Sequence, residues 1–294
     1  MICHGFSCKR RTVLLLYARG RILRFIAYLF FCCLFPLFPA NADTAAADFG
    51  ENGRDIVDAS HYPWSAMGRV QWAAVGHKAH CTGTLISEKV VLTAAHCLFN
   101  VRARKWVSPG LVHFVAGYQK GEFLAHSVAK AIYRSKDFDR LEGVTTKNLL
   151  SDWALLELKE PIGGKTGFLG WRILNPQELR QAQKDGQEVM LAGYPQNRAH
   201  VISVDHPCKA GMGQPPNALI THTCYIVGGD SGGPVMLRDG NKLTIIGLNS
   251  ARRGNGDTAT ASAVPLLRLR DNLLSVLGLS NTDHKRGQAP LASR

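Results

Sequence analysis

Residues 228–234 read Gly-Gly-Asp-Ser-Gly-Gly-Pro, a serine enclosed by glycines on which the interpretation of the whole chain depends. Glycine is unfavourable inside helices and strands, but it allows tight turns and close approach of the backbone to a ligand. Such a turn can direct the backbone N–H groups of Gly229 and Ser231 to one side, where they could hold the oxygen of a tetrahedral acyl intermediate. A Gly-Ser-Gly turn is, by itself, more often an ordinary turn with an exposed serine.

Two further segments offer the groups that would activate a serine. A serine hydroxyl is a weak nucleophile until a base takes its proton, and histidine suits that task because its pKa lies near neutrality. His96 ends the apolar run VVLTAAHC (residues 90–97), where a disulfide at Cys97 would hold its backbone still. Asp152 opens the apolar run DWALLELK (residues 152–159), so its carboxylate should lie at the edge of the core and need hydrogen-bond donors. Taken singly, each residue also has a purely structural explanation.

Taken together, these segments resemble the trypsin/chymotrypsin family of serine endopeptidases. TAAHC (residues 93–97), D-x-A-L-L (residues 152–156) and GDSGGP (residues 229–234) are similar to its three catalytic signatures. They occur in its chain order of His, Asp and Ser, which differs from the order in subtilisin-like enzymes and α/β-hydrolases. The resemblance covers residues 56–278. Two other segments look like the bacterial secreted branch, including glutamyl-endopeptidase-like members: Tyr62-Pro63-Trp64-Ser65-Ala66 and Gly193-Tyr194-Pro195.

This resemblance implies an all-β fold of two packed six-stranded antiparallel β-barrels with a C-terminal helix and a catalytic cleft between the barrels. It also implies roles for individual residues. Ser231 would attack the peptide carbonyl, and His96 would act as general base and then as general acid. Asp152 would orient the imidazole, and the N–H groups of Gly229 and Ser231 would form the oxyanion hole.

The first 42 residues have the parts of a secretory signal. They contain six basic residues and no acidic one, then an apolar stretch over residues 26–39 and the small-x-small sequence Ala40-Asn41-Ala42. Pro36 and Pro39 interrupt the apolar stretch, which is shorter than the roughly 20 residues that a membrane-spanning helix needs. We expect a cleaved signal, a secreted or periplasmic protein and no stable membrane insertion afterwards. An uncleaved N-terminal anchor is the alternative.

The charge of the chain favours no nucleic-acid partner. The formal net charge of the whole chain is +13, but without the six basic residues of the first 42 positions, residues 43–294 contain 29 basic and 22 acidic residues, a net charge of +7. No basic block is interleaved with aromatic residues, as nucleic-acid binding would require. The remaining basic groups are scattered: Arg102, Arg104 and Lys105; Arg252 and Arg253; Arg268 and Arg270; Lys285 and Arg286.

Four cysteines remain after the leader: Cys81, Cys97, Cys208 and Cys224. An even number in an exported chain favours disulfides, and four cysteines allow three pairings. Pairing neighbours would close two loops of 15 intervening residues, each worth roughly 3 kcal/mol in the chain-entropy account. The resemblance implies Cys81–Cys97, which brackets the family's catalytic histidine, and proximity favours Cys208–Cys224. A zinc site of His77, His80 and Cys81 lacks a spaced fourth ligand, so we expect neither metal nor cofactor.

Period-two and β-branched patterns dominate the chain after the leader. They predict strands over residues 64–71, 80–87, 89–92, 111–118, 126–133, 153–159, 188–193, 218–223, 234–237, 242–249 and 261–265. Two helices are predicted, one from the cap Asn175 to Lys184 and the other from Leu266 to Leu277. The expected organisation is a signal peptide (1–42), an N-terminal segment (43–62), a first barrel (63–162), a connector (163–186), a second barrel (187–265), a C-terminal helix (266–278) and a disordered tail (279–294).

The resemblance also bears on specificity. In the family, the residue six before the nucleophile lines the base of the primary pocket, where an aspartate selects Lys or Arg; here that residue is Tyr225. Glutamyl endopeptidases use a threonine five before the nucleophile and a histidine on the neighbouring strand, where this chain has Ile226 and Asn249. A pocket of Tyr225, Ile226, Asn249 and Ser250 is uncharged and gains mainly by burying apolar surface, roughly 25 cal/mol per Å². We therefore expect an apolar or small residue before the cut, although Arg252 and Arg253 could draw acidic side chains to the pocket mouth.

Activation is where the sequence departs from the family. Many members are zymogens, in which a cut after a basic residue frees an Ile-Val amine that pairs with the aspartate before the nucleophile. Asp230 and Ile56-Val57 are present, but Asp55 precedes Ile56, and Arg54 is one residue too early for that cut. We expect activity that does not require a free amine at Ile56.

The sequence thus predicts a monomeric serine endopeptidase acting on polypeptides. Two alternatives share its motifs. One is an inactive homologue that serves as a binding module, and the other is an esterase with the same triad. Intact triad positions argue against the first, and the absence of a strand–turn–helix context for G-x-S-x-G argues against the second.

Overall fold

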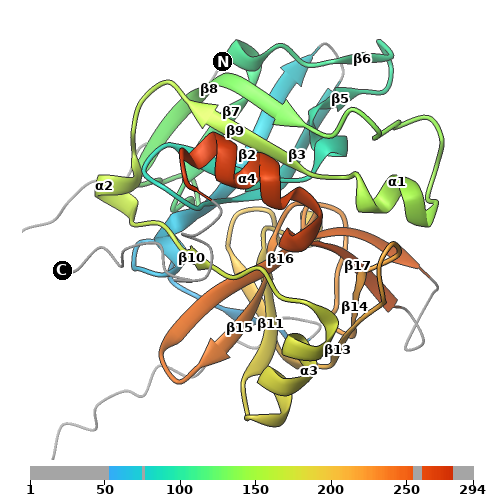
Figure 1. Ribbon diagram of the computed structural model, residues 1–294. Coiled ribbons are helices and arrows are strands. Elements are labelled where there is room, and N and C mark those ends of the chain that lie inside the picture. The colour runs from blue at the N-terminus through green and yellow to red at the C-terminus, as the bar shows by residue number, and fades with distance from the viewer. Residues whose placement is uncertain (1–52, 75–76, 254–259, 281–294) are drawn as a thin grey trace, which may run out of the picture. The chain divides into compact units, whose positions relative to one another are not determined.

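The computed structural model describes residues 53–74, 77–253 and 260–280, and all of them belong to the larger of the two compact units of the chain, residues 47–294. They form two β units, with a helix near the C-terminal end (Figure 1). The predicted signal segment and most of the predicted tail lie outside the described residues. Within the described ranges, no helix is long and apolar enough to cross a membrane.

The first unit is a closed antiparallel barrel, as expected, and its strands follow the order β2-β3-β4-β9-β8-β7. The strands are β2 (Met67–Ala74), β3 (His77–Leu85), β4 (Val90–Thr93), β7 (His113–Ala116), β8 (Ala125–Arg134) and β9 (Ala154–Leu158). Every residue of β4 is buried, and in β8 buried positions alternate with exposed ones at first, as expected for a strand with one face toward the barrel interior.

The second unit is a curled sheet of nine strands rather than a barrel closed by hydrogen bonds at every edge. Its strands are β1 (Asp55–Ile56), β10 (Gly170–Trp171), β11 (Glu188–Gly193), β12 (Ser203–Cys208), β13 (Ala210–Met212), β14 (Ile220–His222), β15 (Pro234–Asp239), β16 (Lys242–Arg253) and β17 (Thr260–Pro265). The main path runs β1-β12-β11-β15-β16-β17-β14-β13. Only Lys209 separates β12, the second strand of this path, from β13, the last strand, so the sheet curls back on itself there.

The remaining elements are short. They are η1 (Trp64–Ala66), η2 (Ala95–Leu98), β5 (Phe99–Asn100), β6 (Lys105–Trp106), η3 (Pro109–Leu111), α1 (Thr146–Leu150), α2 (Gly163–Thr166), α3 (Pro176–Lys184), η4 (Gln196–Arg198), η6 (Leu266–Leu269) and α4 (Arg270–Leu277). The predicted helix after Asn175 is confirmed. Asn175 accepts a bond from the Glu178 N–H at 2.9 Å, and the Glu178 carboxylate accepts one from the Asn175 N–H at 2.7 Å, which together form a capping box.

The predicted C-terminal helix begins as the 3₁₀ turn η6 and continues as α4, which ends at Gly278 in the left-handed conformation. Leu273 and Leu274 of α4 are buried in a hydrophobic cluster that also contains side chains of both β units. One shared core therefore fixes the helix and the two β units together, and residues carried by different units can be held in register.

Candidate active site

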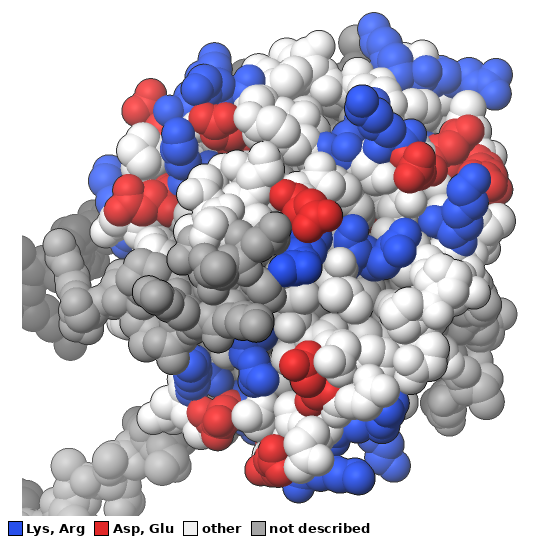
Figure 2. Space-filling model, viewed as in Figure 1, with Lys and Arg blue, Asp and Glu red and all other residues white. Residues whose placement is uncertain are grey.

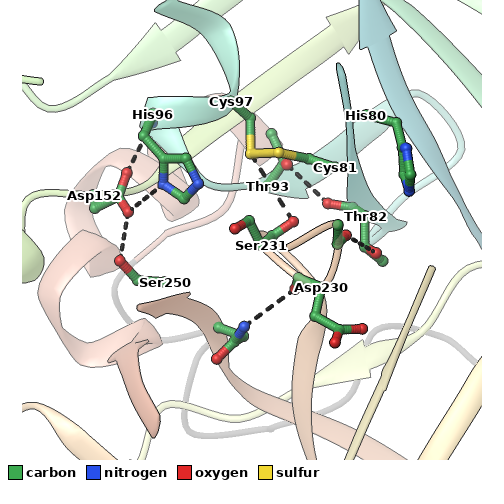
Figure 3. Close-up of a disulfide and its surroundings, with 12 residues drawn as sticks. His80, Cys81, Thr82, Thr93, His96, Cys97, Asp152, Asp230, Ser231 and Ser250 are labelled. Carbon is green, nitrogen blue, oxygen red and sulfur yellow. Dashed lines mark hydrogen bonds and ion pairs between the residues drawn. A yellow bond between two sulfur atoms is a disulfide. The ribbon is translucent and has the colours of Figure 1, made fainter. Parts of the chain in front are cut away.

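His96 and Asp152 meet because their strands are neighbours. β4 and β9 pair antiparallel, with Thr93 opposite Ala154, so the residues just after β4 and just before β9 lie at the same end of the barrel. His96 lies in η2, which follows β4, and Asp152 lies two residues before β9. The His96 Nδ1 atom is 2.7 Å from Asp152 Oδ2, and the His96 backbone N–H donates to Oδ1 at 2.8 Å (Figure 3). Both carboxylate oxygens are thus used to fix one histidine.

Asp152 is a buried carboxylate, 2% exposed, whose oxygens have several donors. Besides His96, the Ser250 hydroxyl on β16 donates to Oδ2. Burial would raise the pKa of Asp152, but the adjacent His96 and the bonds from His96 and Ser250 hold it below its ordinary value of 3.8. The carboxylate therefore stays ionised at neutral pH. Sequence reasoning placed Ser250 in the specificity pocket, and its contact with Asp152 depends on the packing of β16 against the first barrel.

Two glycines shape the turn that carries Ser231. Gly229 has φ +95°, and a Cβ there would lie 2.3 Å from the Tyr194 carbonyl oxygen. Gly232 has φ +78°, and a Cβ there would lie 2.3 Å from Thr93 Oγ1. At both positions the backbone has a left-handed conformation and lies close to another segment of the same chain. Only glycine accommodates this combination without strain. The glycines flanking Ser231 are therefore required by the packed turn.

Thr82 on β3 joins this turn to the first barrel. Its Oγ1 donates to the Gly229 carbonyl oxygen at 2.9 Å, and its backbone N–H donates to the Ser231 carbonyl oxygen at 2.9 Å. The same Oγ1 accepts a bond from the Tyr194 N–H at 2.9 Å. Sequence reasoning missed Thr82, for which the only local signal is its place next to Cys81.

The two disulfides lie beside the same segments. The structure joins Cys81 to Cys97, with 6.1 Å between the Cα atoms, and Cys208 to Cys224. The first links β3 to the turn that carries His96, and the second links the end of β12 to the chain leading into the Ser231 turn. Among the described residues, the two groupings of potential metal ligands each include one of these disulfides, and a disulfide sulfur is not a thiolate ligand. Neither grouping suits a metal, and the side chain of His77 lies outside the described residues.

Ser231 faces His96 across the boundary between the two units. Figure 3 shows the His96 imidazole between the Asp152 carboxylate and Ser231. Within the turn, the N–H groups of Asp230, Gly232 and Gly233 donate to backbone carbonyl oxygens. In the part of the chain that the structure describes, the N–H groups of Gly229 and Ser231 donate to no backbone carbonyl oxygen, so both remain available to a ligand oxygen.

The four residues expected in the specificity pocket occupy different environments. Ile226 is buried in the hydrophobic cluster of the second unit. Asn249 is buried, accepts a bond from the Gly232 N–H at 2.7 Å and donates from its own N–H to the Gly233 carbonyl oxygen at 2.8 Å, so its backbone holds the serine turn. Tyr225 is half-buried, and the Arg252 guanidinium lies 5.6 Å from the centre of its ring. Ser250 donates to the Asp152 carboxylate.

His222 lies deep in the second unit and was not singled out from the sequence. It is buried on β14, and burial lowers its pKa to about 4, an effect that the neighbouring Asn249 side chain opposes. Its imidazole is therefore uncharged at neutral pH. Asp230, the residue before Ser231, is also buried, and the Arg54 guanidinium lies 2.8 Å from its carboxylate.

Comparisons with known proteins agree with this geometry. A family model described as Trypsin matches residues 52–271. The chain is 23% identical over 197 residues to "Glutamyl endopeptidase" of Bacillus licheniformis, covering 65% of this chain and 55% of that protein. It is 26% identical over 192 residues to "Trypsin epsilon" of Drosophila erecta, covering 60% of this chain and 69% of that protein. The chain thus spans little more than half of the first relative.

Solved structures show the same fold. A Glu endopeptidase structure in complex with MPD aligns with TM-score 0.58 at 19% identity, covering 77% of this chain and 98% of that one. The thermostable serine protease AL20 from an extremophilic microorganism aligns with TM-score 0.56 at 18% identity, covering 74% and 98%. At these identities the likeness establishes the fold alone.

Proposed function

The chain belongs to the trypsin family of serine proteases, and on that premise we propose that it hydrolyses peptide bonds through an acyl-enzyme formed on Ser231. One observation carries the proposal. The buried, ionised Asp152 binds both the Nδ1 and the backbone N–H of His96, on the side of the imidazole opposite Ser231. That arrangement keeps a proton on Nδ1 and leaves Nε2 as the acceptor for a hydroxyl proton.

The reaction then proceeds in two acyl-transfer steps. The Ser231 oxygen adds to the peptide carbonyl carbon while His96 Nε2 takes the hydroxyl proton, and the N–H groups of Gly229 and Ser231 hold the oxyanion. His96 returns the proton to the leaving amine, which breaks the C–N bond and leaves an ester on Ser231. Water, deprotonated by His96, adds to this ester and releases the new carboxyl terminus together with the serine hydroxyl.

We further propose that the protein is exported and that its substrates are polypeptides. The basic leader with its A-x-A sequence and the two disulfides support export, because disulfides persist in oxidising compartments. Figure 2 shows Lys/Arg and Asp/Glu side chains distributed over both halves of the visible face, an arrangement that favours no polyanionic partner there.

For the primary pocket we propose a preference for apolar or small residues and none for Lys or Arg. Tyr225 occupies the position at which the pocket would need an acidic residue to bind a basic substrate side chain. The nearby Arg252 guanidinium would repel such a substrate side chain. The same Arg252 contact favours acidic residues as the second candidate. It places a positive group beside the ring of Tyr225, where a carboxylate could bind it.

A fluorophosphonate probe tests the activity directly. We expect the wild-type enzyme to form a covalent adduct on Ser231 and the Ser231→Ala variant to form none. A folded wild-type protein that does not react would identify an inactive binding homologue. Hydrolysis of simple esters without cleavage of a denatured protein mixture would identify an esterase.

A further inference from the structure

Asp230 is a fully buried carboxylate at the centre of the site. It is 0% exposed, and it directly precedes the proposed nucleophile. An ionised carboxylate in such surroundings is unstable without a counter-charge and hydrogen-bond donors. The Val227 N–H donates to Asp230 Oδ2 at 3.0 Å. This hydrogen bond does not neutralise the negative charge of the carboxylate, which still needs a positive partner.

No chain terminus at Ile56 is needed to supply that charge. Ile56 lies within β1, where it pairs with Ser203 of β12, and Asp55 pairs with Val204. The positive group that reaches Asp230 comes from the residue just before this strand. Arg54 is 3% exposed, and its Nη1 lies 2.8 Å from Asp230 Oδ2.

The Arg54 guanidinium also binds two backbone segments that surround the serine turn. Its Nη2 donates to the Ser203 carbonyl oxygen on β12 at 2.7 Å, and its Nη1 donates to the Tyr225 carbonyl oxygen at 3.3 Å. The three acceptors belong to β12, to the segment leading into the turn and to the turn itself. A planar guanidinium can serve several acceptors in this way, whereas a lysine ammonium acts as a single point charge.

We infer that Arg54 is an internal activating cation: in the uncut chain it pairs with Asp230 and holds the turn of Gly229 and Ser231 in its competent form. This inference rests on the proposed function. Arg54 acts through Asp230 and touches no substrate, so it is a positioning residue. A cut after Arg54 or before Ile56 would separate this cation from the folded strand, so the active chain keeps Arg54, and any processing cut lies before it.

This role can be tested by replacing Arg54 with alanine and then adding guanidinium ions to restore the missing positive charge. We expect Arg54→Ala to lower kcat/KM on a peptide substrate about 100-fold, because it leaves a buried carboxylate without its partner. Millimolar guanidinium chloride should restore activity at least tenfold by occupying the vacated site. Urea, which has a similar shape and no charge, should not. Arg54→Lys should keep activity within about tenfold of wild type.

Arg69→Ala is the matched control. Arg69 is a half-buried arginine on β2, and its guanidinium contacts the Ala199 carbonyl oxygen and the ring of Tyr118 instead of the serine turn. We expect that variant to remain within about threefold of wild type and to be unaffected by guanidinium.

The outcomes separate this inference from the proposed function. If wild type forms no fluorophosphonate adduct, both fail. If wild type reacts and folded Arg54→Ala reacts equally fast, or if urea restores activity as well as guanidinium does, only the role of Arg54 fails. Should Arg54→Ala not fold, N-terminal sequencing of the active wild-type enzyme decides. A first residue at or before Arg54 supports the inference, and an active chain that begins at Asp55 or Ile56 overturns it.

Discussion

Asp152→Asn probes the tautomer of His96, and the structure determines what the amide must do. The His96 backbone N–H donates to Oδ1 at 2.8 Å, so the amide oxygen of an asparagine has to occupy that position. Its NH₂ group then replaces Oδ2, which lies 2.7 Å from His96 Nδ1. Two donors cannot face each other, so Nδ1 loses its proton and Nε2 carries it. An imidazole protonated on Nε2 cannot accept the proton of Ser231.

The alternative amide orientation restores the useful tautomer but places the NH₂ group against the His96 backbone N–H. Leaving such buried donors unsatisfied costs about 1–3 kcal/mol each, so this orientation is a minor state. Together with the lost carboxylate charge, we expect kcat to fall roughly 10⁴-fold, or about 5.5 kcal/mol of transition-state stabilisation.

Steady-state hydrolysis of a peptide substrate measures this loss, and thermal unfolding confirms that the variant is folded. Ser250→Ala is a milder variant for comparison, because it removes one hydrogen-bond donor to Asp152 Oδ2 but keeps the carboxylate charge. A hydrogen bond to a charged group is worth about 1.5–3 kcal/mol, so we expect a loss of roughly 10-fold to 100-fold. Asp152→Asn with more than a tenth of wild-type activity would refute the tautomer argument.

Two further predictions concern the disulfides and the pocket. Peptide mapping without reduction should find Cys81 joined to Cys97 and Cys208 joined to Cys224; a peptide joining Cys81 to Cys208 would contradict both pairings. Mass spectrometry of a denatured protein mixture should show apolar or small residues before the cut, because Tyr225 offers no charge to a basic side chain. A profile dominated by Lys and Arg would overturn the place given to Tyr225, and one dominated by Glu and Asp would place Arg252 or Arg253 in the pocket.

The sequence predicted those parts of the site that local patterns encode. His96, Asp152 and Ser231 each belong to a short contiguous motif, and the capped helix after Asn175 has its signals within four residues. Period-two patterns likewise located the strands of the first barrel. Strand β12 was missed because Ser203–Cys208 includes Pro207 and mixes polar with apolar residues.

Residues that act through long-range contacts could not be predicted in this way. Thr82 and Ser250 reach the site because of the register of distant strands, and Arg54 meets Asp230 across 176 positions of the chain. Nothing next to Arg54 in the sequence distinguishes it from an exposed arginine. Its burial depends on the pairing of β1 with β12, a contact between a two-residue strand and a strand that the pattern did not show.

The central claim is that Ser231 is the nucleophile, and peptide mapping after reaction with a fluorophosphonate tests it most directly. We expect one added phosphonyl group, located on the peptide that contains Ser231, together with complete loss of peptide hydrolysis. Ser231→Ala should fold normally, take up no label and hydrolyse peptides roughly 10⁶-fold more slowly than wild type. A label on another residue, or more than a tenth of wild-type activity in Ser231→Ala, would show that Ser231 is not the nucleophile.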